Sequence, residues 1–340
     1  MMILKHNEPF VTESGAILPE LEIAYSTWGR LNDKKDNVIW VCHAYTANSD
    51  VESWWPGMLG DEMLFDTREY FVVCANILGS CYGTTGPVSI NPQTSKPWLN
   101  NFPVITIRDI VRVHEILRVL LGISVIDTVI GSSIGGFQAL EYGIMYPDQV
   151  RRLILIASNA KQSPWSIAFN ESQRLAIEAD SSFFGDDIDG GKKGLKAARS
   201  MALLSYRTPY AYNQTQAEET DDKLTSFRAS SYQAYQGDKL VNRFNPWTYY
   251  RLTQLSDSHN VGRGRGGVTE ALKLIKAYAL CIGIKSDLLF PVAEQKFLAE
   301  NIEKGSYAEI DSFFGHDGFL IEAGQVSSVI KKFWEETSRK

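Results

Sequence analysis

The sequence predicts an α/β fold in which helices flank a mainly parallel sheet and a helical segment is inserted between two strands. Three observations indicate this class. Short β-branched runs alternate with amphipathic helical patterns in the first half of the chain. About one hundred residues from position 161 onward have helical periodicity without a clear strand, and strand signals then return near residue 277. Alternation of strands and helices is typical of a parallel sheet covered on both faces.

The strands of the predicted core are short, apolar and rich in β-branched residues, as expected for strands buried on both faces. In chain order they are residues 37–44, 70–76, 125–130, 152–158, 277–284 and 307–311. The segment "RDIVRVHEILRVLLG" (108–122) has the periodicity of an amphipathic helix between the second and third of these runs.

The central part of the chain has a different character. The segments "SPWSIAFNESQRLAIEAD", "GGKKGLKAARSMALLSYR" and "NPWTYYRLTQLSD" are helical in pattern and rich in aromatic residues. We therefore expect an α/β core formed by residues 1–160 and 265–340, and a helical lid formed by residues 161–264 over the carboxyl ends of the strands.

Composition narrows the possible partners. The chain has 340 residues, of which 44% are apolar and 22% charged, so it can bury a large core. The net charge of −6 comes from interspersed acidic and basic residues, which argues against nucleic-acid binding and against a polybasic membrane patch. Apolar segments are too short to span a bilayer, so we expect a cytoplasmic protein.

The cysteines predict neither disulfides nor a metal site. Cys42, Cys74 and Cys281 lie in strand-like runs, Cys81 lies in a loop, and no C-x-x-C spacing occurs. Ordinary core thiols are expected.

The stretch "TVIGSSIGGFQALEYG" (128–143) joins a predicted strand to a predicted helix. Its turn, Gly131 to Gly135, fits the G-x-S-x-G pattern of a nucleophile elbow. The glycines allow neighbouring backbone to crowd the turn, so Ser133 Oγ projects above the sheet and the Ile134 N–H faces a developing oxyanion. The alternative is a glycine-rich turn with an incidental serine; the position between strand and helix favours the elbow.

A serine nucleophile requires a base and an orienting carboxylate. In an α/β-hydrolase sheet these follow in the order serine, acid, histidine, each after a strand. His316, in "FFGHDGFLIE", is the histidine that meets this order, and Asp287 in "CIGIKSDLLFP" supplies the acid. Taken alone, an aspartate after a strand is also a common turn former or helix cap. The other histidines are His6 in the N-terminal segment, His43 after a strand, His114 in a helix and His259 at the end of the insertion.

The segment "CHAYTAN" follows the first predicted core strand, where this architecture places its second oxyanion donor. The backbone N–H of Tyr45 is the candidate donor, and His43 is interpreted as a structural residue.

The chain resembles the homoserine O-acetyltransferase family of α/β-hydrolase-fold enzymes over nearly its whole length, including the insertion. The blocks that carry the resemblance are "CHAYTAN", "FVVCANILGSCYGTTGP", "FPVITIRDIV", "GSSIGGFQALEY", "NESQRLAIEAD", "GLKAARSMALLSYR", "YQGDKLVNRF", "KSDLLFP" and "GHDGFLIE". The resemblance implies transfer of an acetyl group from acetyl-CoA to the side-chain hydroxyl of L-homoserine, a step of methionine biosynthesis. It also implies a homodimer formed through the lid helices.

Matching motifs imply roles for individual residues. Ser133 would be the nucleophile, with Asp287 and His316 as its partners. Arg199, in "GLKAAR", would clamp the homoserine carboxylate, and Asp317 would contact the amino group. Acetyl-CoA would be a co-substrate, and no cofactor or metal is implied. The family usually has leucine and glycine where this chain has Tyr45 and Ala47. This difference leaves the identity of the acyl donor less certain than the reaction class.

Several alternatives remain open from the sequence. The donor could be succinyl-CoA and the acceptor L-serine; the same triad could serve a serine esterase or thioesterase; the chain could be a catalytically silent binding module. Arg199 could be an ordinary surface arginine and Asp317 a turn residue. The segment "GRGRGG" (262–267) could bind CoA phosphates, but it lacks the lysine and Ser/Thr of a P-loop, which favours a flexible return from lid to core.

Overall fold

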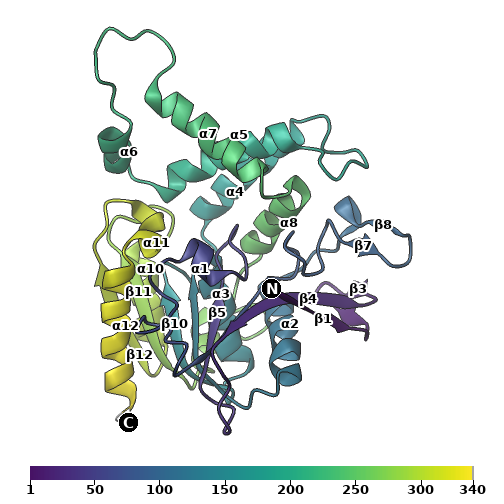
Figure 1. The fold of residues 1–340 in the computed structure, drawn as a ribbon, viewed down its shortest axis with the longest axis vertical. Helices are drawn as coiled ribbons and strands as arrows, with labels where there is room; N and C mark the ends of the chain where they lie inside the picture. The colour runs from purple at the N-terminus through teal and green to yellow at the C-terminus, as the bar shows by residue number, and fades with distance from the viewer. Residues whose placement is uncertain (339–340) are drawn as a thin grey trace.

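The centre of the molecule is an eight-stranded sheet with the strand order β1-β4-β6-β5-β9-β10-β11-β12 (Figure 1). The structure is a computed structural model that describes residues 1–338. The sheet strands are β1 (Met2–His6), β4 (Leu21–Trp28), β5 (Val38–Cys42), β6 (Phe71–Ala75), β9 (Ile126–Ser132), β10 (Val150–Ile156), β11 (Tyr278–Ile284) and β12 (Gly305–Ile310).

Six neighbouring strands pair in parallel, in the order β6, β5, β9, β10, β11 and β12. At one edge, β4 pairs antiparallel with β6, and β1 pairs antiparallel with β4. The parallel strands are the six that the sequence predicts, and they confirm the fold class. The sequence analysis missed β1 and β4. Met2 pairs with Tyr25, and Tyr25 pairs in turn with Ala75 of β6. The short strand β1 lies at the sheet edge and buries none of its residues fully, so it lacks the pattern of a core strand and its pairing with β4 identifies it.

In core strands such as β5, β6 and β11, successive residues alternate between two hydrophobic clusters, one on each face of the sheet. In β5, Val38 and Trp40 belong to one cluster, and Ile39 and Val41 to the other. This alternation follows from the two-residue period of a strand. The first cluster includes α2 (Ile107–Leu120), α3 (Ile134–Met145) and α10 (Val292–Asn301). The second includes α1 (Val51–Trp54), α11 (Gly318–Ile321) and α12 (Ala323–Ser338).

Shorter elements complete the loops before α2. They are β2 (Phe10–Val11), β3 (Ile17–Leu18), β7 (Ile90–Asn91), β8 (Lys96–Pro97) and the 3₁₀ turn η1 (Leu99–Asn101).

The chain between β10 and β11 is helical, and its helices between residues 164 and 257 lie above the sheet in Figure 1. Its two ends meet, because Lys161 and Asn260 form an antiparallel bridge and Val261 N–H donates to the Ala160 carbonyl at 3.0 Å. The proposed domain boundaries at residues 161 and 264 stay a prediction. The helices are α4 (Pro164–Glu178), α5 (Lys192–Tyr206), α6 (Pro209–Thr215), α7 (Arg228–Val241), α8 (Pro246–Asp257) and α9 (Val268–Leu272).

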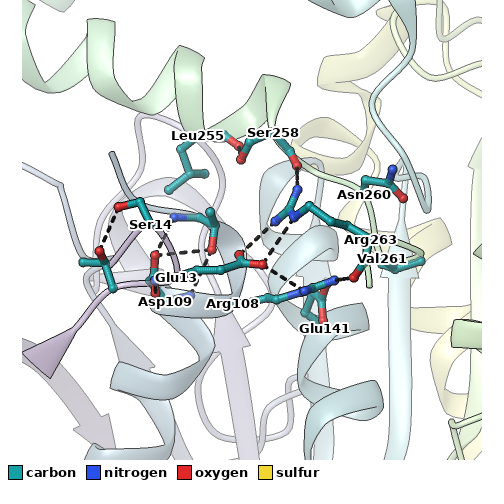
Figure 2. A network of polar contacts seen from close by, with 12 residues as sticks. Glu13, Ser14, Arg108, Asp109, Glu141, Leu255, Ser258, Asn260, Val261 and Arg263 are labelled. Atoms are coloured by element: carbon teal, nitrogen blue, oxygen red, sulfur yellow. Dashed lines mark hydrogen bonds and ion pairs between the residues drawn. The ribbon is translucent and has the colours of Figure 1, made fainter. Parts of the chain in front are cut away.

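The segment 262–267 is tied to the rest of the fold by ion pairs (Figure 2). Arg263 pairs with Glu13 at 2.8 Å, and Arg265 pairs with Glu141 of α3 at 2.8 Å. Arg108 of α2 lies between the two carboxylates, 2.9 Å from Glu13 and 3.2 Å from Glu141. The arginines of "GRGRGG" are therefore already paired, which argues against a phosphate-binding role for them.

The cysteines are free thiols, as expected. Cys42, Cys74 and Cys281 are buried in β5, β6 and β11, and burial raises the pKa of each thiol. Cys81 is partly buried in a loop. Over residues 1–338, none of the helices combines the length and apolar character needed to cross a membrane.

Candidate active site

Ser133 lies in a strained turn between β9 and α3. Its φ of 57° is in the left-handed region, which side chains rarely adopt. Neighbouring backbone crowds the turn: a Cβ on Gly131 would lie 2.0 Å from the Gly135 carbonyl oxygen, and a Cβ on Gly135 would lie 2.2 Å from that of Cys42. Only glycine fits at these two positions, which explains the spacing of the motif. Ser132 is buried, whereas Ser133 is partly exposed.

Two backbone N–H groups next to this turn are unpaired within the described chain, those of Ile134 and Tyr45. Ile134 is the first residue of α3, and the first N–H groups of a helix lack an intrahelical acceptor. Tyr45 lines the same cavities as Ser133. Both groups are thus available to an oxyanion formed at Ser133, although their role as donors stays a prediction.

His43 fixes the backbone that leads into Tyr45. Its Nδ1–H donates to the Ala44 carbonyl at 2.9 Å, and its Nε2 accepts from Ile77 N–H at 3.1 Å. Burial lowers the His43 pKa to about 4, so the ring is neutral at physiological pH. These contacts agree with a structural role.

Asp287 and His316 come together after β11 and β12, in the order that the sequence suggests. His316 Nδ1 lies 2.7 Å from Asp287 Oδ2. The other carboxylate oxygen accepts from the N–H groups of Leu289 at 2.8 Å and Phe290 at 2.9 Å. The carboxylate is therefore held in place and orients the imidazole, leaving Nε2 as the nitrogen available to the cavity.

Opposing effects act on the His316 pKa. Burial lowers it, and the adjacent Asp287 carboxylate raises it through its charge and its hydrogen bond. The net effect raises the His316 pKa above its ordinary value. The imidazolium that forms when the base accepts a proton is thus stabilised by Asp287.

Ser133 and His316 line one cavity of about 360 Å³. Within residues 1–338 no hydrogen bond joins Ser133 Oγ to the ring, so proton transfer requires a closer approach of the two groups. The cavity lies between the sheet and the inserted helices. Its lining residues are Ala44, Tyr45, Thr46, Ala47, Asn48, Ser53, Trp54, Ser133, Arg199, Tyr206, Lys239, Arg243, His316, Asp317, Phe319 and Leu320.

Arg199 and Asp317, the predicted substrate-binding residues, both line this cavity. The Arg199 guanidinium lies 5.5 Å from the centre of the Tyr206 ring and has no carboxylate partner in the part of the chain that the structure describes. Asp317 pairs with Arg207, whose Nε lies 2.6 Å from Asp317 Oδ2. The sequence analysis missed Arg207, although it closes the block "GLKAARSMALLSYR".

A second, smaller cavity of about 40 Å³ shares Tyr45, Ser133 and Tyr206 with the first. Its lining residues are Tyr45, Ser133, Ile134, Phe137, Gln162, Ser166, Phe169, Asn170, Gln173, Ser205, Tyr206, Ser256, Leu289 and Phe290. This lining contains aromatic and neutral polar residues but no charged side chain.

The remaining histidines, His6, His114 and His259, line neither of these two cavities. His114 is buried in α2, and burial lowers its pKa to about 3. His259 stacks on Phe137 with ring centres 3.9 Å apart, and burial lowers its pKa to about 3 as well. His6 lies in β1. No cluster of three or more potential metal ligands occurs in residues 1–338.

Comparison with known proteins identifies the fold and the family of this chain. A family model described as "alpha/beta hydrolase fold" matches residues 37–323. A homoserine O-acetyltransferase from Cyclobacterium marinum is 47% identical over 97% of this chain and 94% of its own length.

Solved structures give the same fold. The homoserine O-acetyltransferase from Bacillus anthracis has a TM-score of 0.88 at 26% identity, covering 98% of both chains. A mutant of esterase E22 has a TM-score of 0.89 at 26% identity, covering 98% of this chain and 99% of its own. The sequence match over nearly the full length thus assigns this chain to the homoserine O-acetyltransferase family of α/β-hydrolase-fold proteins.

Proposed function

We propose that this protein is a homoserine O-acetyltransferase that moves an acetyl group from acetyl-CoA to the side-chain hydroxyl of L-homoserine, a step of methionine biosynthesis. The observation that carries the proposal is one cavity that holds Ser133, His316 and the unpaired cation Arg199. The first two suit acyl transfer through a serine nucleophile. The third suits an acceptor with a carboxylate, because its planar guanidinium can bond both oxygens.

In the first half-reaction Ser133 Oγ attacks the thioester carbonyl while His316 accepts its proton. Asp287 holds the imidazole tautomer, and the N–H groups of Ile134 and Tyr45 stabilise the oxyanion. The intermediate collapses as the C–S bond breaks, the thiolate of CoA leaves with the proton from His316, and acetyl-Ser133 remains.

In the second half-reaction His316 removes the proton from the homoserine hydroxyl, which attacks acetyl-Ser133. The ester bond to Ser133 breaks, and the serine recovers a proton from His316. Arg199 would hold the acceptor's carboxylate, and Asp317, oriented by Arg207, would contact its ammonium group. Water competes with the alcohol at this step, so holding the acceptor next to the acyl group decides the product.

The smaller cavity supports acetyl over succinyl as the transferred group. Its volume of about 40 Å³ suits a methyl group, and its lining offers no cation to a succinyl carboxylate. Tyr45 lines both cavities, and its side chain is held in place because its hydroxyl donates to the Tyr249 carbonyl at 2.7 Å.

An esterase acting through the same triad is the second candidate, and the fold shared with esterase E22 favours it. The two functions differ in the product of the acyl-enzyme. The test gives the enzyme acetyl-CoA and succinyl-CoA together with L-homoserine and L-serine and identifies the products by mass spectrometry. The proposal requires O-acetyl-L-homoserine as the main product, and free acetate formed at the same rate with and without homoserine would favour the esterase.

We also propose a homodimer formed through the inserted helices. Several of their large apolar side chains are exposed, including Trp165, Leu175, Leu204 and Tyr235. These side chains lie on the neighbouring helices α4, α5 and α7, and an apolar surface shared by these helices would suit a protein interface.

A further inference from the structure

Three cations at the large cavity have no carboxylate partner within residues 1–338: Arg199, Lys239 and Arg243. Lys239 is an exposed residue of α7. The carboxylate next to it in sequence, Asp238, pairs instead with Lys196 at 2.7 Å. Lys239 therefore presents an uncompensated charge to the cavity.

Arg243 is held in position by uncharged groups. Its guanidinium donates to the hydroxyl of Tyr82 at 2.9 Å and to that of Thr46 at 3.1 Å, and it also donates to the Thr46 carbonyl. These contacts fix the side chain without neutralising it. Because Thr46 directly follows Tyr45, the charge lies beside the segment that supplies the proposed oxyanion donor.

The charge of this cavity contrasts with that of the whole chain. The net charge of the protein is −6. The carboxylate that lines the cavity, Asp317, is neutralised by Arg207. A surplus of unpaired cations around the nucleophile of an acidic protein indicates an anionic ligand.

The proposed acceptor accounts for one of the three cations, because its single carboxylate matches Arg199. Two cations remain, and the proposed donor has the anionic groups to match them. We propose that Lys239 and Arg243 bind the phosphate groups of CoA, an inference that rests on the proposed function. The pantetheine arm of the donor would then run past Trp54, Phe319 and Leu320 to bring its thioester to Ser133. The arginines of residues 262–267 are not available for this role, because Glu13 and Glu141 hold them.

The test compares two donors that share the acetyl thioester and the pantetheine arm: acetyl-CoA and acetyl-pantetheine, which lacks the phosphates. Thiol release without acceptor is measured for wild type, Lys239→Gln, Arg243→Gln and the double variant. For acetyl-CoA at low salt we expect each single variant to lower kcat/KM roughly three- to tenfold, and the double variant to lower it further. For acetyl-pantetheine we expect changes of less than about twofold. Added salt should weaken the effect on acetyl-CoA, since exposed charges are screened.

Two controls separate charge from shape. Lys332→Gln removes another exposed, unpaired cation, from α12, and should leave kcat/KM for both donors unchanged. Arg243→Lys keeps the charge and should retain most of the acetyl-CoA activity. Equal losses with both donors would overturn the inference, because the residues would then shape the cavity rather than bind phosphate. Unchanged acetyl-CoA kinetics in the double variant would overturn it as well.

Binding of CoA to Ser133→Ala, measured by calorimetry, distinguishes this inference from the proposed function. Affinity that falls when the Lys239 and Arg243 substitutions are added supports the phosphate site, even if homoserine is never acetylated and the proposed function fails. Homoserine acetylation that proceeds equally well in the double variant would keep the proposed function and refute the phosphate site.

Discussion

Replacing Arg199 tests whether the cavity binds an acceptor through its carboxylate. If Arg199 binds only that carboxylate, it acts after the acyl-enzyme has formed. Arg199→Ala should still release a burst of CoA of about one equivalent per active site, provided that hydrolysis of the acyl-enzyme is slow. Its KM for homoserine should rise steeply, because the carboxylate would lose the cation that the proposed function assigns to it.

The size of this effect follows from the surroundings of Arg199. The side chain is half-buried, has no competing carboxylate and lies 5.5 Å from the Tyr206 ring, so its charge is less screened than that of a surface arginine. A bidentate charge-assisted contact in such a place contributes about 2 to 4 kcal/mol. The corresponding loss in kcat/KM for homoserine is roughly 30- to 1,000-fold. Arg199→Lys should recover only part of it, since an ammonium group cannot reproduce the planar fork.

The assay is stopped-flow detection of free thiol, with and without homoserine, on wild type and both variants. A folded Arg199→Ala protein without the burst would refute the reasoning, because the residue would then belong to donor binding or to the frame of the site. Unchanged homoserine kinetics would also refute it and identify Arg199 as an ordinary surface arginine.

The remaining predictions concern the nucleophile, the base, the ion-pair network and the dimer. Ser133→Ala should remain folded, and its acyl-transfer rate should fall by several orders of magnitude, whereas that of Ser132→Ala should fall much less. Peptide mass mapping that located the acetyl group on Ser132 would contradict the assignment of Ser133 as the nucleophile. Acylation should rise with pH as His316 loses its proton, with a midpoint above about 6.5 because Asp287 raises the His316 pKa. In Asp287→Asn, burial remains as the main influence on the His316 pKa and lowers it. The acylation rate should therefore drop, and the midpoint of its pH profile should shift to lower pH. An unshifted midpoint would mean that another group orients His316. Glu141→Gln leaves Arg265 without its partner and should lower the free energy of unfolding, measured by urea titration, by about 3 kcal/mol. The control Lys276→Ala removes an exposed ion pair and should lower it by less than about 1 kcal/mol. Equal losses in the two variants would argue against a stabilising role of the ion-pair network. Leu204→Glu should shift the protein from dimer to monomer in light scattering, and a wild type that is already monomeric would exclude the proposed interface.

The local chemistry of the site could be predicted from the sequence because it depends on short segments. The G-x-S-x-G turn requires glycine wherever backbone atoms approach within about 2 Å, as at Gly131 and Gly135, so the position of Ser133 is encoded within a few residues. Asp287 and His316 follow β11 and β12, and the carboxyl ends of parallel strands meet at one edge of a sheet. Strand order along the chain therefore indicated which side chains would meet before any distance was known.

Contacts between distant segments could be decided only by the tertiary structure. The pairing of Asp317 with Arg207 joins residues 110 positions apart, and that of Arg263 with Glu13 joins residues 250 apart. No local pattern specifies such partners, since a charged side chain in sequence gives no sign of which opposite charge will lie near it. The same holds for Lys239 and Arg243, whose residue types are common on any surface. Their significance comes from facing the cavity of Ser133 without a carboxylate, and long-range packing of the inserted helices against the sheet puts them there.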